Sequence, residues 1–233
     1  MRFTWNKNEI RWLLDAGSYT GFHKALAQIV VPHLEADGTL CDLGCGLGRL
    51  DLELSAHVRE LTAIDINENA TGVLRRDVEM LGIDNLRVRV GDTLSLTEVF
   101  DIVLMSFFGW TDMSDYLKLC RKKLIRIVST ENKSGLYPEN HRCKEKVTIP
   151  VVHEELVTKG VEYKLELHSA EFGQPLVSWE EAVSFVRKNA PEATAEEIGG
   201  FLNARLERTG REDFPFYLPN QKEFGIFIID KEE

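Results

Sequence analysis

Asp42, Gly44, Gly46 and Gly48 alternate with other residues in the stretch LCDLGCGLGRLDLELSAHV, which joins an apolar run to a helical pattern. Glycine-rich hinges of this kind bind phosphates, dinucleotides or nucleosides, because a backbone without side chains lets a ligand approach closely. A phosphate loop is excluded, since it needs a Gly-Lys dipeptide and the chain contains none. The dinucleotide pattern G-x-G-x-x-G fails in both registers, because arginine or aspartate stands where its third glycine should be. Taken alone, the remaining pattern, acid-x-Gly-x-Gly-x-Gly, also fits a tight strand–helix turn that holds no ligand.

Two further acidic residues follow expected strands. Asp65 ends the run ELTAID, 17 residues after Gly48, and Asp92 lies in VGDTL after the run NLRVRV. Taken singly, each acid could be a helix N-cap or a turn residue. In this order, with the hinge before them and the apolar run FDIVLMSF after them, they resemble the motifs of class I S-adenosylmethionine-dependent methyltransferases over about residues 38–130. The resemblance implies S-adenosylmethionine as the cofactor.

The resemblance also implies a role for each acid. Asp42 would lie near the cationic methionine part of the cofactor, Asp65 would accept the ribose hydroxyls, and Asp92 would bind the adenine amino group. Tyr19 is added because it stands in GSYTG, where a ring between two glycines suits a segment that closes over a ligand; a fixed turn between two helices is the alternative. The other expected cofactor contacts are neighbours of the motifs: Gly44, Cys45, Gly46, Gly48, Ile66, Thr93 and Ser106.

The methyl acceptor is harder to predict, because transfer from a sulfonium is an in-line displacement that needs positioning more than a particular side chain. The segment MSFFGW lacks the [DNS]-P-P-[YF] motif of amino methyltransferases, and its Phe107, Phe108 and Trp110 either line an acceptor pocket or pack in the core. His141 is the predicted general base and His23 a predicted acceptor contact, although an ordinary surface or hydrogen-bonded histidine is the more frequent case for each. The cysteines and histidines show no metal-ligand spacing, so no metal site is expected.

Alternating strands and helices must position these residues, and they predict an α/β fold. Its expected core is a doubly wound, mostly parallel seven-stranded sheet whose last strand is antiparallel. Ahead of it, two helices joined by a flexible GSYTG form a cap, and after the fourth strand a helix is expected at 113–122. Capping boxes that begin at Ser178 and Thr194 predict two helices inserted before the last strand. The predicted divisions are a cap at 1–37, a cofactor-binding core at 38–172, a helical insertion acting as an acceptor lid at 173–222, and a last core strand at 223–233.

Composition limits the partners. The net charge of −10 argues against nucleic acid, whose binding depends on phosphate neutralisation, and no apolar run reaches membrane-spanning length. The first residues lack the apolar stretch of a signal peptide, so a cytoplasmic location is expected. The sequence therefore predicts a methyltransferase that acts on a small-molecule acceptor, with no indication of its oligomeric state. Two alternatives stay open: a protein or RNA methyltransferase, and a protein that binds the cofactor without catalysis.

Overall fold

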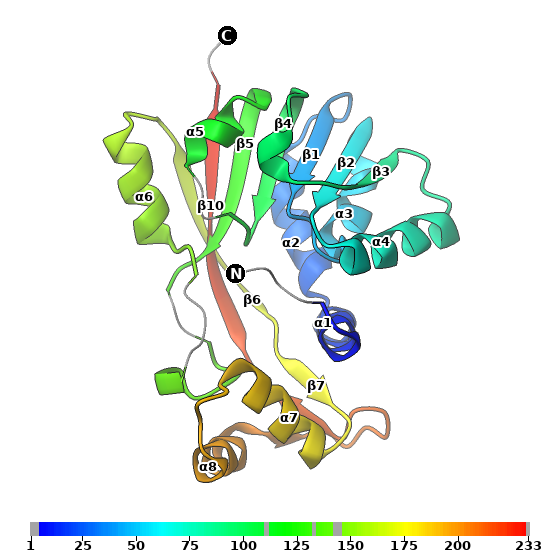
Figure 1. The fold of residues 1–233 in the computed structure, drawn as a ribbon, viewed down its shortest axis with the longest axis vertical. Coiled ribbons are helices and arrows are strands. Elements are labelled where there is room, and N and C mark those ends of the chain that lie inside the picture. The colour runs from blue at the N-terminus through cyan, green and yellow to red at the C-terminus, as the bar shows by residue number, and fades with distance from the viewer. Residues whose placement is uncertain (1–4, 110–111, 132–133, 142–145, 232–233) are drawn as a thin grey trace.

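The computed structural model describes residues 5–109, 112–131, 134–141 and 146–231, which form a large upper body and a small lower lobe (Figure 1). In the body, the described residues build a seven-stranded sheet in the order β3-β2-β1-β4-β5-β10-β6. Within this sheet β10 runs antiparallel to both of its neighbours, and the other pairs in the β3-to-β5 part are parallel. The predicted fold class is thereby confirmed. The strands are β1 Thr39–Leu43, β2 Glu60–Asp65, β3 Leu86–Val90, β4 Phe100–Ser106, β5 Cys120–Ser129, β6 Lys164–Glu171 and β10 Gln221–Asp230.

Helices cover both faces of the sheet, and two separate apolar clusters fill the layers between. The cluster on one face includes α2, α3 and α4, and that on the other includes α5 and α6. In β4, Ile102 and Leu104 belong to the first cluster, whereas Val103 and Met105 belong to the second, and all four are at most 1% exposed. This burial on both faces explains why the strand reads as continuously apolar. The bounds are α2 Phe22–Val30, α3 Arg49–Leu54, α4 Glu68–Leu81, α5 Met113–Leu117 and α6 Ile149–Thr158, with short 3₁₀ turns η1 Val31–His33, η2 Ser55–His57, η3 Thr93–Ser95 and η4 Glu139–His141.

The N-terminal helix α1, Lys7–Thr20, is longer than predicted. It continues through Gly17 and ends at Gly21, whose φ of +67° is the left-handed conformation of a helix C-cap. Gly17 is needed for packing instead of flexibility, because a Cβ there would lie 2.7 Å from the ring of His23. The flexible GSYTG linker is therefore wrong: the break between the helices is the single residue Gly21.

The helix predicted at 113–122 is also wrong in its second half. It ends at Leu117, and β5 begins at Cys120, which pairs with Phe100 of β4. The basic run that starts at Arg121 therefore lies in a strand, where Arg121 forms an ion pair with Asp101 at 3.4 Å. Strand pairing, a long-range interaction, overrides the local helical pattern here.

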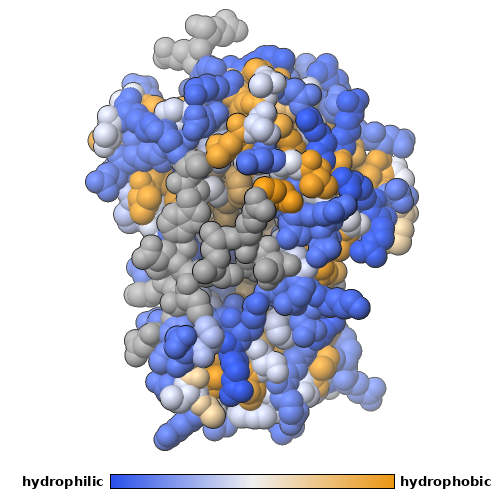
Figure 2. All heavy atoms as spheres, in the orientation of Figure 1, coloured by the Kyte–Doolittle hydropathy of each residue, from blue (hydrophilic) through white to orange (hydrophobic). Residues whose placement is uncertain are grey.

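The small lobe contains the two predicted helices, α7 Trp179–Asn189 and α8 Ala195–Arg205, and both begin at the predicted caps Ser178 and Thr194. It also holds a three-stranded sheet that the sequence did not predict, formed by β7 Gln174–Leu176, β9 Phe216–Leu218 and β8 Glu207–Arg208. Strands of two or three residues are too short to show an alternating pattern. The face of the molecule in Figure 2 is mostly hydrophilic over the lobe and carries hydrophobic patches over the body.

A two-stranded ribbon connects the body to the lobe. One of its sides runs from β6 into β7 and the other from β9 into β10, and the two stay hydrogen-bonded between the sheets. At the crossing, Phe172 donates its N–H to the carbonyl of Asn220 at 2.8 Å, and the Asn220 side chain donates back to the Phe172 carbonyl at 3.1 Å. Helix α1 packs beside this ribbon, with Trp12 in the apolar cluster of the lobe.

Candidate cofactor and acceptor site

The glycine hinge follows β1 in a tight left-handed path. Gly44, Gly46 and Gly48 have φ values of +76°, +56° and +63°, which favour glycine strongly. Two of these positions also lack space for a side chain, because a Cβ would lie 2.1 Å from the ring of Phe108 at Gly44 and 2.3 Å from Leu74 at Gly48. The hinge thus needs glycine both for its left-handed backbone path and for the side chains that pack directly against it.

The acids at the ends of β2 and β3 lie at the same edge of the sheet as the hinge, and the first of them contacts it. Asp65 accepts the N–H of Gly46 at 2.9 Å with one carboxylate oxygen and the N–H of Asn67 at 2.8 Å with the other. Asp92 is exposed and caps the next turn by accepting the N–H of Leu94 at 3.0 Å. The neighbouring Ile66 is exposed, whereas Thr93 is buried. Each acid therefore shapes its own turn and also lies at the carboxyl edge of the sheet, where ligands of open α/β sheets bind.

Asp42 lies beneath the hinge and faces a residue that the sequence analysis did not single out. Its carboxyl group is within hydrogen-bonding reach of Asp51 in the first turn of α3, and both side chains are almost completely buried, 2% and 0% exposed. Oδ1 of Asp42 and both carboxyl oxygens of Asp51 have no hydrogen-bond donor among the described residues. Burial raises the pKa of Asp51 to about 7, and burial together with Asp51 raises the pKa of Asp42 well above its ordinary value. Burial therefore favours the protonated form of both carboxyl groups.

The end of β4 brings aromatic side chains to the hinge. Ser106 is half-buried, Phe107 adopts a φ of +52°, and the ring of Phe108 covers Gly44. Phe107 lies 6.4 Å from the ring of Phe22 and 6.0 Å from that of Phe224, and Phe22 stacks on Phe172 at 4.3 Å. Trp110, predicted with Phe107 and Phe108, lies outside the described residues.

Lys222, at the beginning of β10, places its amine among these aromatic rings. Its Nζ lies 3.4 Å from the centroid of Phe107, and burial, assisted by Lys146, lowers the pKa of Lys222 to about 7. Lys222 is the last residue of the insertion predicted at 173–222, and it was not predicted to belong to the site. The signal was available, because Lys222 continues the alternation of Phe224, Ile226 and Ile228, whose side chains face one apolar cluster.

His23 lies close to this cluster. Its ring is 5.7 Å from that of Phe172, and burial, with Lys222 and Arg49, lowers the pKa of His23 to about 3, so its imidazole is neutral. Tyr19 instead faces the small lobe, where it stacks on Tyr217 at 4.8 Å. The structure therefore brings His23 to the aromatic cluster and places Tyr19 against the lobe.

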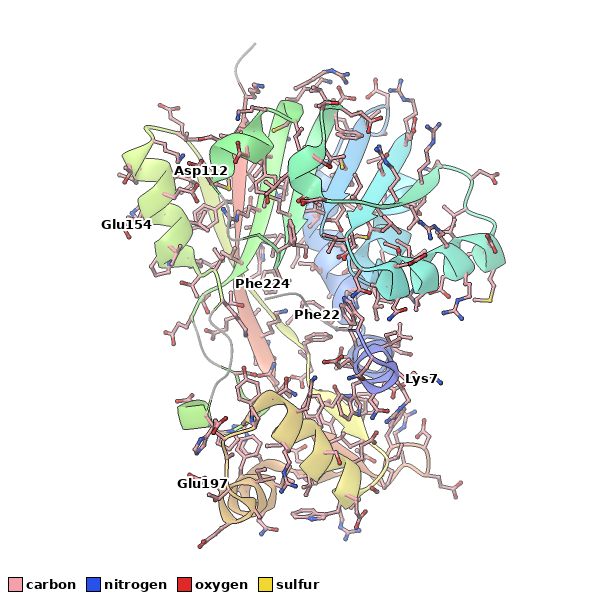
Figure 3. All side chains as sticks on the ribbon, in the orientation of Figure 1. Lys7, Phe22, Asp112, Glu154, Glu197 and Phe224 are labelled. Carbon is pink, nitrogen blue, oxygen red and sulfur yellow. The ribbon has the colours of Figure 1, made fainter. Side chains whose placement is uncertain are left out.

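His141 is engaged by the small lobe. Its Nε2 lies 2.8 Å from Glu197 of α8, and the pKa of Glu197 is lowered to about 2 by the N–H of Thr194 and then by His141. Figure 3 places Glu197 low in the lobe, far from the strands that carry the hinge. The structure does not bring the predicted general base to the hinge.

A cavity of about 200 Å³ lies between α1, the ribbon and the small lobe. Aromatic side chains form much of its lining: Trp5, Trp12, Tyr137, Phe172 and Phe185. Trp5 links it to the hinge, because a Cβ at Gly46 would lie 3.2 Å from the Trp5 indole. An ion pair between Glu9 and Lys188, 2.9 Å long, joins α1 to α7 at the same cavity.

Residues 40–127 match the family described as "Methyltransferase domain". The chain is 27% identical over 96 residues to a Methanococcus maripaludis protein named probable cobalt-precorrin-6B C(15)-methyltransferase (decarboxylating). The aligned residues make up 41% of this chain and 53% of that protein. It is also 30% identical over 119 residues to the ribosomal RNA small subunit methyltransferase G of Neisseria meningitidis. That alignment covers 46% of this chain and 57% of the relative. The chain thus spans about half the length of these curated relatives.

The fold is shared with a solved structure, that of magnesium protoporphyrin IX methyltransferase from Synechocystis with bound SAH. The TM-score is 0.55 at 13% identity, over the whole of this chain and 90% of the other. The family match, the strand order and the hinge together identify residues 40–127 as a class I, Rossmann-like methyltransferase domain, for which S-adenosylmethionine is the cofactor. Among the described residues, no helix is long and apolar enough to span a membrane.

Proposed function

We propose that this protein transfers a methyl group from S-adenosylmethionine to a small-molecule acceptor. The observation that carries the proposal is the aromatic-lined cavity of about 200 Å³ beside the hinge, enclosed by α1, the ribbon and the lobe. Concave, mostly apolar sites of this kind suit small ligands. The net charge of −10 supports a small acceptor over a polyanion, and the printed names of the precorrin and protoporphyrin methyltransferases agree with that class.

The residues around the hinge fit the cofactor. Gly44, Gly46 and Gly48 give the hinge its left-handed path, and Asp65 already holds the hinge through the Gly46 N–H, so its carboxylate is positioned to accept a ribose hydroxyl as well. In the proposal Asp92 receives the adenine, and the adjoining residues complete the contact surface: Cys45, Ile66, Thr93 and Ser106. When bound, the cofactor supplies an electrophilic methyl group on a sulfonium.

The chain's own contribution is to orient the acceptor and exclude water. Phe107 and Phe108 follow β4 and pack toward opposite faces of the sheet, and in the proposal the ring of Phe108 against Gly44 borders the hinge. Trp5 closes the side toward the cavity. An in-line displacement is accelerated mainly by aligning the two reactants in a site without water. The rings would therefore contribute by holding the acceptor and excluding water, without acting as acids or bases.

Radiolabel transfer tests the proposal. The protein is incubated with S-adenosylmethionine labelled in its methyl group and with a cell lysate separated into small-molecule, RNA and protein fractions. Label in the small-molecule fraction is the expected result. Label in RNA would favour the alternative that the Neisseria relative suggests, and cofactor binding without transfer to any fraction would favour a non-catalytic binding protein.

A further inference from the structure

Lys222 holds an amine inside an aromatic cluster at the carboxyl edge of the sheet. Its Nζ lies 3.4 Å from the ring centroid of Phe107, 5.1 Å from that of Phe22 and 5.2 Å from that of Phe172. Figure 3 shows Phe22 and Phe224 close together at the waist between body and lobe, the level at which the ribbon crosses. The amine therefore lies where the acceptor site of the proposed function meets the sheet.

The charged groups that act on Lys222 are themselves basic. Lys146 opposes its protonation from the segment before α6, and Lys222 in turn opposes protonation of His23 on α2. His168 of β6 lies beyond Phe224, 5.9 Å from its ring.

The nearest carboxylates along the ribbon either bind other residues or lie on the opposite face of the strand. Glu171 of β6 accepts from the Tyr217 hydroxyl and from the N–H of Asn220, and Glu223 follows Lys222 on the opposite face of β10. Among the described residues, no carboxylate forms an ion pair with Lys222. In a chain with a net charge of −10, an amine left without an acidic partner is an unusual arrangement.

A desolvated amine without a counter-ion is costly to protonate, and that cost is recovered when an anion binds against it. We infer that Lys222 is the anchor for a carboxylate on the acceptor, so that the protein methylates a small apolar or aromatic carboxylic acid. The inference rests on the proposed function. The carboxylate is an anchor and not the methylated atom, because a cation bound to the attacking group would weaken its nucleophilicity.

The position of Lys222 suits this task. Phe172, one of its three rings, also lines the cavity, so an acceptor anchored at Lys222 can extend its apolar part into that space. Phe107, another of the rings, follows β4, which pairs in the sheet with β1, the strand that leads into the hinge. Lys222 is therefore a positioning residue placed between the cavity and the cofactor hinge.

Benzoate and benzamide test the inference, because they share one shape and differ in charge. Each is titrated into the full-length protein saturated with SAH, and the affinities are measured by calorimetry. We expect the wild type to bind benzoate about tenfold more tightly than benzamide, Lys222→Met to lose that preference, and Lys222→Arg to retain most of it. Lys164→Met, at the far end of β6 and 77% exposed at its side chain, is the matched control and should behave as the wild type.

SAH binding separates the possible failures. If the wild type does not bind SAH, the proposed function fails with the inference. If it binds SAH but does not distinguish benzoate from benzamide, or if Lys222→Met keeps the preference, the inference alone is overturned. Lys222→Met should bind SAH within about twofold of the wild type, which shows that the variant is folded.

Discussion

The buried pair Asp42 and Asp51 makes the stability of this protein depend on pH in the direction opposite to that of a salt-bridged acid. Asp51 is 0% exposed, and its carboxyl group faces that of Asp42 without an ion-pair partner among the described residues. Asp51→Asn keeps the shape of the side chain, removes its ionisation, and supplies an N–H that can donate to Asp42. We expect this variant to be more stable than the wild type at alkaline pH.

The sign follows from the raised pKa. Folding favours the protonated form of Asp51, so the carboxyl group lowers the free energy of unfolding only where it is ionised in the unfolded chain. This loss of stability is absent below the unfolded pKa, grows as the pH rises from about 4 to 7, and is constant at higher pH. A rise of the pKa from 3.8 to about 7 corresponds to about 4 kcal/mol at pH 8 and on the order of 1–2 kcal/mol at pH 5. The stability difference between variant and wild type should therefore widen as the pH increases.

Urea unfolding followed by circular dichroism measures this difference at a series of pH values. Asp115→Asn is the control, because Asp115 lies on the surface of α5 with a side chain that is 49% exposed, and its substitution should leave the pH dependence unchanged. Parallel stability curves for Asp51→Asn and the wild type from about pH 5 to 8 would refute the reasoning, since they would mean that Asp51 ionises as freely in the folded protein as in the unfolded chain.

Four other substitutions, one of them a control, test the site and its support. Gly44→Ala should impair both folding and SAH binding, because its Cβ would lie 2.1 Å from an aromatic ring; Gly72→Ala, in open space on α4, should instead gain about 1 kcal/mol in thermal unfolding. Asp65→Ala should weaken SAH binding about ten- to hundredfold in calorimetry, as expected for a lost charge-assisted hydrogen bond, and an affinity within about twofold of the wild type would remove Asp65 from the cofactor site. Arg126→Met should cost about 3–5 kcal/mol in urea unfolding, because Arg126 is 1% exposed and its loss leaves Glu155 without its partner at 3.5 Å; a cost below about 1 kcal/mol would show that the pair is not needed for the fold.

The parts of the fold that depend on local pattern could be predicted from the sequence. The apolar β4 and the cap residues Ser178 and Thr194 carry their structure in a few neighbouring residues, and the structure confirms them. The parts that depend on distant partners could not. The helix expected to reach residue 122 stops because Cys120 pairs with β4, and Gly17 stays helical because the ring of His23 packs against it.

The same division holds for the candidate site. The hinge and its acids follow from spacing, because the carboxyl ends of adjacent parallel strands meet at one edge. The raised pKa values of Asp42 and Asp51, and the rings around Lys222, depend on burial and on contacts that the local sequence pattern does not show. The sequence alone does not show which side chain a charged or aromatic residue will contact in the folded protein.

The ribbon between the sheets has a consequence for how such an enzyme could change. Both connections of the small lobe to the body pass through neighbouring strands, held together by Phe172 and Asn220. An exchange of residues 174–218 for another segment would cut the chain at two adjacent points and leave the seven-stranded sheet intact. Helix α1, joined to α7 through Lys188 and Glu9, would have to be exchanged with it. The architecture thus allows the small lobe, together with α1, to diversify while the hinge is inherited unchanged.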